Sequence, residues 1–202
     1  TLYRRNISWF DPGDVNTITD KGIKAGTYYI SVPIWSGSGN FQLKITHTPV
    51  GHEDAEPNDV FTNAIPIADG SISEGHLGYE FWGDEDVYDW YTFTTTTDGE
   101  VSFSIQTDTF ELARVGLYNI MRDTFDVERR NLSYDSGKEV EFTQTDLKAG
   151  QYFLRISIEN GCGSYTMKTS IKPDSLANDR EPNDMLSTAD TIVLGTRKTG
   201  HM

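Results

Sequence analysis

The chain has 202 residues, of which 36% are hydrophobic, and a formal net charge of −14. The apolar share and the many aromatic residues exclude an intrinsically disordered chain, and 17 basic residues against 31 acidic ones exclude a nucleic-acid partner, which needs clustered Lys and Arg. No apolar run approaches the roughly 18 residues of a membrane span. The single cysteine, Cys162, excludes an internal disulfide; exported bacterial proteins often lack disulfides, and a metal can stabilise them instead.

The first predicted elements are two runs of alternating apolar and polar residues, at 26–33 and 40–46. Phe41, Leu43 and Ile45 share one face of the second run. A Ser-Gly-Ser-Gly-Asn turn separates the two runs, so we expect them to form a hairpin. The polar stretch 48–53 that follows is a predicted linker.

The middle of the chain has weak helical character only at 59–64. Period-two alternation and frequent Thr predict strands at 90–97 and 101–105. Two more alternating runs, 151–158 and 164–169, flank an Asn-Gly-Cys-Gly turn, and we expect a second hairpin there. Short strands separated by regular turns predict an antiparallel β-sandwich.

Two sequence motifs occur twice at nearly the same separation. EPND stands at 56–59 and again at 181–184, while KAGTYY at 24–29 returns as KAGQYF at 148–153. A common spacing of about 125 residues indicates tandem copies of one module. The predicted domains are 1–50 (the C-terminal part of a first module), 51–173 (a complete module) and 174–202 (a linker and the N-terminal part of a third). The partial copies are expected to expose apolar faces that pack on the complete module, pair with another chain, or are completed by further sequence.

Acidic residues gather in two clusters. Asp54, Glu56 and Asn58 point the same way in an extended chain, and a second acidic cluster at 84–89 comes just before a predicted strand. Calcium takes six to eight oxygen ligands, which two such clusters together can supply, whereas the absence of a cysteine cluster and the scattered histidines argue against zinc. Acidic runs are also typical of solvated loops, but the same spacing recurs around the second EPND, which favours a metal site.

A catalytic interpretation has less support. Asp86 and Asp89 can be read as a glycosidase pair, but the calcium interpretation also accounts for the linker acids. The chain has no Gly-x-Ser-x-Gly nucleophile elbow, and its histidines show no base–nucleophile pattern. We expect this chain to be non-catalytic.

Taken together, the motifs resemble those of the bacterial pre-peptidase C-terminal domain family, whose relatives include the collagen-binding domains of clostridial collagenases. The matching strings are EPND at 56–59, DVYDWYTF at 86–93, LY at 117–118, KAGQYFL at 148–154 and GSY at 163–165. The resemblance implies a jelly-roll-like β-sandwich found in secreted proteins, often C-terminal to a peptidase. In the collagen-binding relatives calcium lies where the N-terminal linker meets the sandwich. The implied Ca²⁺ ligands in this chain are Asp54, Glu56, Asn58, Asp59, Asp86 and Asp89, with a partial second set at Asp179, Glu181, Asn183 and Asp184.

Collagen binding is a separate expectation. The collagen-binding relatives carry exposed aromatic residues on the strand that follows the Ala-Gly turn. The corresponding outward positions are Ser157 and Glu159 in the complete module and Pro33 and Trp35 in the first copy. Trp35 is therefore the candidate ligand-binding residue, and the alternative is that it is a partly buried packing residue.

The leading expectation is a non-catalytic, calcium-stabilised accessory module of a secreted or cell-surface bacterial protein, such as a secreted peptidase. The alternative is a binding module that targets its parent protein to collagen, another matrix protein or a polysaccharide. A third possibility is a peptidase segment that aids export or maturation.

Overall fold

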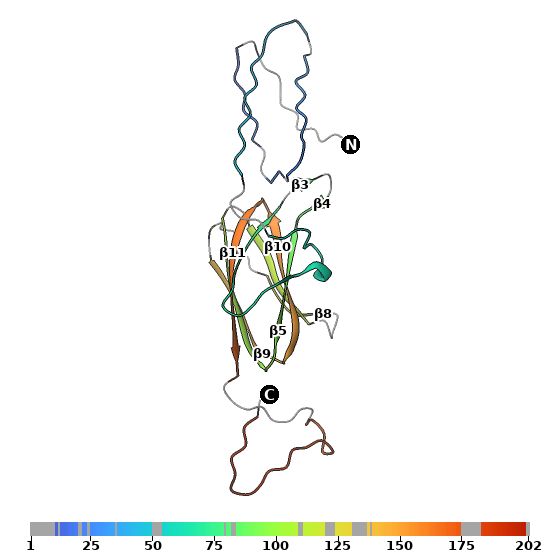
Figure 1. Cartoon of the computed structure of the whole chain (residues 1–202), viewed down its shortest axis with the longest axis vertical. Coiled ribbons are helices and arrows are strands. Elements are labelled where there is room, and N and C mark those ends of the chain that lie inside the picture. Colours follow the sequence, from blue (N-terminus) through green and yellow to red (C-terminus); the bar gives the residue numbers. More distant parts are fainter. Residues whose placement is uncertain are drawn as a thin grey trace.

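The computed structural model describes residues 11, 13–19, 22–23, 25–34, 36–49, 54–78, 80–81, 84–108, 111–119, 124–130, 137, 139–174 and 183–200. A β-sandwich occupies the middle of the chain, and the segments 11–49 and 183–200 extend from its opposite ends (Figure 1). Within the described residues, no helix has the length and apolar character needed to cross a membrane. Trp35, Asp179 and Glu181 lie outside the described residues.

Within the described residues, the middle of the chain contains one short helix and eleven strands. In chain order they are η1 (Phe61–Asn63), β1 (Ile65–Pro66), β2 (Ile72–Leu77), β3 (Glu80–Phe81), β4 (Asp84–Glu85), β5 (Tyr88–Thr95), β6 (Gly99–Thr107), β7 (Glu111–Asn119), β8 (Thr124–Arg130), β9 (Glu139–Leu147), β10 (Gly150–Asn160) and β11 (Gly163–Pro173).

The strands form two facing sheets and a small β3–β4 ribbon. One sheet has the order β1-β5-β10-β7-β8 and the other the order β2-β11-β6-β9. All neighbours are antiparallel except β1 and β5. Among β2 and β5 to β11, every connection except that from β7 to β8 crosses from one sheet to the other. This is the connectivity of a jelly roll, so the prediction of an antiparallel, jelly-roll-like β-sandwich is confirmed.

The predicted hairpins are wrong. β10 pairs with β5 and β7, while β11 lies in the other sheet and pairs with β2 and β6. The turn at 160–163 therefore carries the chain between layers. Alternation shows only that one face of each run is buried, and it cannot distinguish a partner in the same sheet from one in the facing sheet. The described residues of 26–33 and 40–46 are extended but belong to no sheet.

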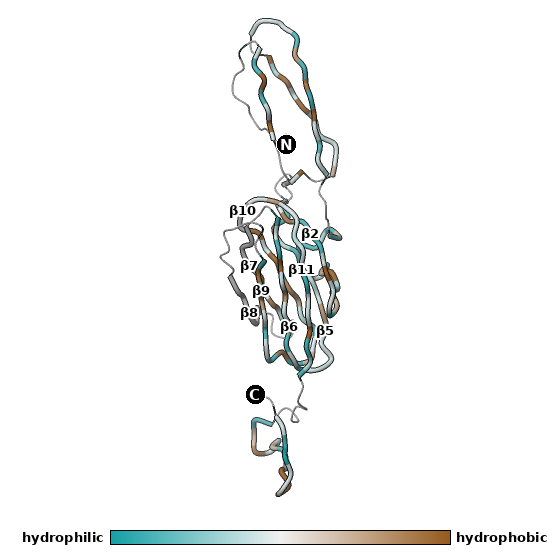
Figure 2. Tube along the Cα trace, turned by 90° about the vertical axis from the view of Figure 1, so that its left-hand side faces the viewer, coloured by the Kyte–Doolittle hydropathy of each residue, from teal (hydrophilic) through white to brown (hydrophobic). Residues whose placement is uncertain are grey.

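The core lies between the sheets and follows the period-two pattern of the strands, visible as alternating hydrophobic and hydrophilic residues in Figure 2. Val101, Phe103 and Ile105 of β6 are buried, as predicted. The ring of Phe103 meets that of Phe93 from the facing sheet, with centroids 5.8 Å apart, in an edge-to-face contact. Aromatic pairs of this kind add about 0.5–1.5 kcal/mol to the burial of apolar area.

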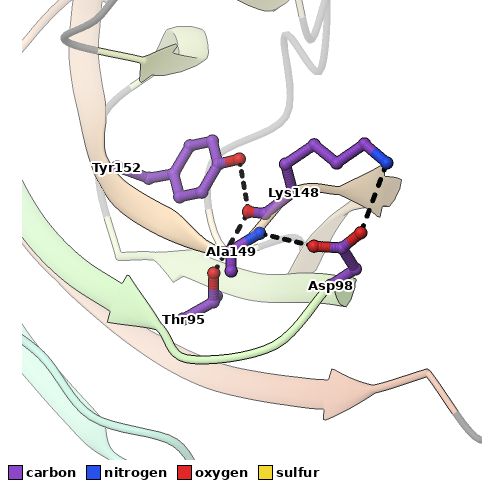
Figure 3. Close-up of polar contacts among 5 residues, drawn as sticks. All are labelled: Thr95, Asp98, Lys148, Ala149 and Tyr152. Carbon is purple, nitrogen blue, oxygen red and sulfur yellow. Dashed lines mark hydrogen bonds and ion pairs between the residues drawn. The ribbon is translucent and has the colours of Figure 1, made fainter. Parts of the chain in front are cut away.

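The repeated Lys-Ala-Gly-x-Tyr motif has a structural role, shown in Figure 3. Asp98, in the β5–β6 turn, accepts a hydrogen bond from the Ala149 backbone N–H at 2.7 Å and pairs with the Lys148 ammonium at 3.3 Å. The Tyr152 hydroxyl donates to the Lys148 carbonyl at 2.7 Å. Thr95 also reaches that carbonyl, at 3.2 Å. The motif thus ties the β9–β10 turn to the β5–β6 turn at one end of the sandwich.

The Asp98 contacts lead to a stability prediction. Asp98→Ala removes the acceptor of the Ala149 N–H and is expected to lower the free energy of unfolding by about 1–3 kcal/mol. Asp98→Asn keeps an acceptor oxygen and loses only a partly exposed ion pair, so its cost is expected to stay below about 1 kcal/mol. Urea unfolding of both variants measures the difference. Equal losses in the two would show that the hydrogen bond to Ala149 is not the main contribution.

Candidate metal centre

The linker segment that carries the first acidic cluster is attached to both sheets. The Trp90 backbone N–H at the start of β5 donates to the Asn58 carbonyl at 3.1 Å. Asp54 Oδ1 accepts from the His76 backbone N–H in β2, at 3.2 Å. The peptide bond between Glu56 and Pro57 is cis. The two hydrogen bonds hold residues 54–58 against β2 and β5.

Within the linker, the acidic side chains also organise one another. The Asn58 amide donates to Asp54 Oδ2 at 2.6 Å, and the Asn58 backbone N–H donates to Glu56 Oε2 at 3.1 Å. Asn58 itself is fully buried. Local hydrogen bonds of this type are what short Asx side chains commonly make in turns, and here they turn the carboxylates of Asp54 and Glu56 to one side.

Strand β5 supplies the third carboxylate. Asp89, Tyr91 and Phe93 alternate onto the inner face of the sheet, so Asp89 points into the sandwich and is 0% exposed. The Tyr165 hydroxyl, from β11 in the other sheet, donates to Asp89 Oδ2 at 2.6 Å. Tyr91 lies 2.5 Å from Tyr165, hydroxyl to hydroxyl. A chain of buried polar groups therefore spans the two layers.

Gly75 makes space for the Tyr165 side chain in this row of buried polar groups. A Cβ atom at Gly75 would lie 2.5 Å from the Tyr165 hydroxyl oxygen and 2.6 Å from the adjacent ring carbon. Gly75 stands opposite Tyr165 in the β2–β11 ladder. A glycine at this position lets the Tyr165 side chain reach across to Asp89.

The two acidic clusters converge at this point. Asp54, Glu56 and Asp89 each place a carboxylate oxygen within 4.8 Å of the others. Asp86 is also buried, and its charge acts on Asp89. Among the described residues, no hydrogen-bond donor reaches Oδ1 of Asp89 or Oδ1 of Asn58, although both atoms are buried. A buried acceptor without a donor is costly, and a cation is one means of satisfying it.

The electrostatics of the site also indicate a shortage of positive charge. Burial, and after it the neighbouring charges of Asp54, Asp86 and Glu56, together raise the pKa of Asp89 from 3.8 to about 9, against the opposing hydrogen bond from Tyr165. Burial likewise raises the pKa values of the Tyr91 and Tyr165 phenols, so both remain protonated donors. The donor set is made of carboxylate and amide oxygens, which suits a hard cation such as Ca²⁺ better than zinc.

The predicted site residues divide into three groups. Asp54, Glu56 and Asp89 form the close cluster, and Asn58 and Asp86 are buried with them. Asp59 is half-buried and lies outside the cluster of carboxylates.

Of the second set, Asn183 and the exposed Asp184 belong to the segment at the far end of the sandwich (Figure 1). The structure adds Tyr91, Tyr165 and Gly75, which the sequence analysis missed. Tyr91 lies in the DVYDWYTF string at 86–93 and Tyr165 in the GSY string at 163–165, but neither hydroxyl was given a role, and no charge pattern points to Gly75.

A second feature lies on the outer face of the β5 sheet. The Arg155 guanidinium is 4.9 Å from the ring centroid of Tyr88 and 5.6 Å from that of Trp90. Phe61 covers the Trp90 ring edge-on, and both Phe61 and Tyr88 are exposed. Ser157, which the sequence analysis placed outward, is buried. Its strand has an irregular register with β7 from this point on. Among the residues of the complete module whose burial the structure describes, the exposed aromatic ones are Phe61 and Tyr88.

No family model and no curated protein matches the chain. Among solved structures, the chain is similar to the pre-peptidase C-terminal domain of collagenase from Bacillus anthracis, with a TM-score of 0.41 and 18% sequence identity over 58% of this chain and 100% of that one. It is also similar to PliG of Aeromonas hydrophila, a periplasmic inhibitor of g-type lysozyme, with a TM-score of 0.37 and 10% identity over 54% of this chain and 96% of that one. The first of these belongs to the family that the sequence motifs resemble.

Proposed function

We propose that the chain is a non-catalytic accessory β-sandwich of a secreted or cell-surface bacterial protein, such as a secreted peptidase, and that Ca²⁺ stabilises it. The observation that supports this proposal is the convergence of the carboxylates of Asp54, Glu56 and Asp89, together with a buried oxygen of Asp89 that no described donor reaches. Asn58 and Asp86 offer further oxygens beside them. A calcium ion would neutralise the cluster and take its oxygens as ligands.

The proposed role is mechanical. The linker at 54–58 already contacts β2 and β5 through Asp54 and Asn58. Binding of a cation between the linker acids and Asp89 couples the docking of the linker to the folding of the sandwich. Ordering of this kind stabilises the folded state in proportion to the logarithm of the metal concentration. The linker then leaves the sandwich in one fixed direction.

The same geometry argues against glycosidase chemistry. A glycosidase needs two carboxyl groups on either side of a substrate, about 5 or about 6.5–9.5 Å apart. Asp89 and Asp86 are buried, and Asp89 is hydrogen-bonded to Tyr165 inside the sandwich. A sugar ring cannot reach a carboxylate in that position.

Calcium is expected to raise the melting temperature of the protein. At a concentration 100 times the dissociation constant, binding contributes about 2.7 kcal/mol, which corresponds to roughly 10 °C for a domain of this size. Differential scanning calorimetry in calcium and in chelator measures the shift. Asp89→Asn is expected to abolish it, because the amide removes the central charge.

The matched control for this measurement is Glu141→Gln. Glu141 is exposed on β9, in the other sheet from Asp89, so its variant loses one negative charge without touching the acidic cluster. It is expected to keep the full calcium shift. A wild-type melting temperature that is the same in calcium and in chelator would contradict the proposal.

The stability of the metal-free protein is expected to depend on pH through Asp89. In the folded state its pKa is about 9, against 3.8 ordinarily, so between these values the folded protein binds more protons than the unfolded chain. The free energy of unfolding in chelator should therefore fall as pH rises from about 5 to 9. Saturating calcium should reduce this slope because the ion replaces the proton. Urea titrations at several pH values measure it, and equal slopes for wild type and Asp89→Asn in chelator would refute the assignment.

A second candidate function is supported by the aromatic surface. Phe61 and Tyr88 are exposed beside Arg155 on the outer face of the sheet, an arrangement found where proteins bind peptides or sugars through stacking. In this alternative the module targets its parent protein to collagen, another matrix protein or a polysaccharide. The metal site and this surface lie on different faces of the β5 sheet, so one does not exclude the other.

Retention on insoluble collagen and on insoluble polysaccharides tests this alternative. Tyr88→Ala and Phe61→Ala are each expected to lower the retained fraction several-fold. Ile72→Ala, an exposed apolar position on β2 in the other sheet, is the control and should bind like wild type. If wild type is retained on none of these materials, or if both aromatic variants bind as well as wild type, the targeting function is excluded for this surface.

A further inference from the structure

The segments at the two ends of the sandwich expose apolar side chains, and in the N-terminal segment these include positions whose counterparts in the sandwich are buried. Phe41 is 69% exposed, whereas Tyr165, at the same place in the repeat, is 2% exposed. Leu43 is likewise exposed, and its counterpart Met167 is fully buried. At the other end Ile192, Val193 and Leu194 are exposed. Clusters of exposed apolar residues normally mark an interaction surface.

The end segments also keep the local backbone geometry of the complete module. Gly70 and Gly195 both have a positive φ, 70° and 83°. The residue after each donates its backbone N–H to the carbonyl three residues earlier, at 3.1 Å in both turns. Asn63 and Thr188 make a second pair of matching turns, each donating to the carbonyl three residues earlier at 2.9 Å. Segment 183–200 therefore has the turns of 58–75.

The N-terminal segment matches the end of the module in the same way. Gly37 has a φ of 82°, and Gly161, its counterpart, has a φ of 93°. The residues that follow are GNFQLK at 39–44 and GSYTMK at 163–168, the start of β11. In the complete module this part of β11 pairs with β2. Segment 39–44 thus has the sequence of a β11-type strand, and 197–200 has the position of a β2-type strand.

We propose that residues 41–44 of one molecule pair with residues 197–200 of a second molecule as antiparallel strands, in the register of β11 and β2. In the sandwich Tyr165 stands opposite Gly75 and Met167 opposite Ser73. The repeat converts these pairs into Phe41 with Gly200 and Leu43 with Lys198. The partner is a second copy because the two segments lie at opposite ends of the sandwich and do not meet within one molecule (Figure 1).

Residue sizes agree with this register. Gly75 has no Cβ where the Tyr165 ring lies. Gly200 lacks a side chain at the position that would face the Phe41 ring. At the outer end of the ladder Lys44 would stand opposite Arg197, and like charges across a strand pair are unfavourable. The association is therefore expected to strengthen with ionic strength. Because the contact is head-to-tail, it adds further copies in a row and does not close as a two-fold dimer.

Disulfide trapping in the full chain tests the pairing and its register. Cys162→Ser removes the native thiol, and Leu43→Cys and Lys198→Cys are then introduced in separate molecules. Mixing the two under mild oxidation is expected to give a cross-linked heterodimer. Thr199→Cys in place of Lys198→Cys is the register control, because its side chain points to the other face of the strand, and its yield is expected to be at least several-fold lower.

Sedimentation of the unmodified chain provides a second measurement that needs no substitution. The average mass is expected to rise with protein concentration and with salt, and Phe41→Glu is expected to abolish the rise. The experiments are done in chelator, because neither segment contains a counterpart of Asp89, so a failed calcium proposal leaves this result unaffected. A monomer at all concentrations, or equal cross-linking by the Lys198 and Thr199 partners, would overturn the proposal.

Discussion

The structure depends on one buried carboxylate. Asp89 lies inside the sandwich, where one of its oxygens is bound to Tyr165 of the facing sheet, and a carboxylate oxygen of Asp89 lies within 4.8 Å of oxygens of the linker acids Asp54 and Glu56. A charge in that position is unfavourable unless it takes up a proton or gains a cation. The arrangement around it, with Gly75 leaving space for Tyr165, keeps the carboxylate in place despite that cost. An inner position occupied by an acid in this way is hard to explain by packing alone.

The linker brings two more carboxylates close to the buried carboxylate of Asp89. It contacts β2 through Asp54 and β5 through Asn58, so it reaches both layers at their shared end. A cation among Asp54, Glu56 and Asp89 would therefore join three parts of the chain: the linker and the two sheets. The direction in which the preceding segment leaves the sandwich would follow from those contacts, whereas a linker held by hydrogen bonds alone would be free to detach.

Local sequence rules explain much of the fold but not its pairing. Alternation correctly identified β6, β10 and β11 as strands, and the structure brings Asp54 and Glu56 of one acidic cluster close to Asp89 of the other. The partner of each strand was missed, because a period of two marks a buried face without saying which sheet lies beside it. Tyr165 and Gly75 were missed for a related reason: an uncharged hydroxyl and an absent side chain matter only once the facing strand is known. Asp59 shares the linker with Asp54 but lies outside the cluster of carboxylates, a distinction that spacing alone does not make.

The flanking segments show the same division between local and distant interactions. Gly195 and Thr188 reproduce the turns of Gly70 and Asn63 although no sandwich surrounds them, since a positive φ and a three-residue hydrogen bond need only neighbouring residues. The strand-like stretches behave differently. Phe41 and Leu43 remain exposed and belong to no sheet, because a strand is stabilised by partners that are distant in sequence. In these segments the turns form locally, whereas the strand-like stretches need a partner. Their pairing therefore depends on a chain that presents a β2-type strand.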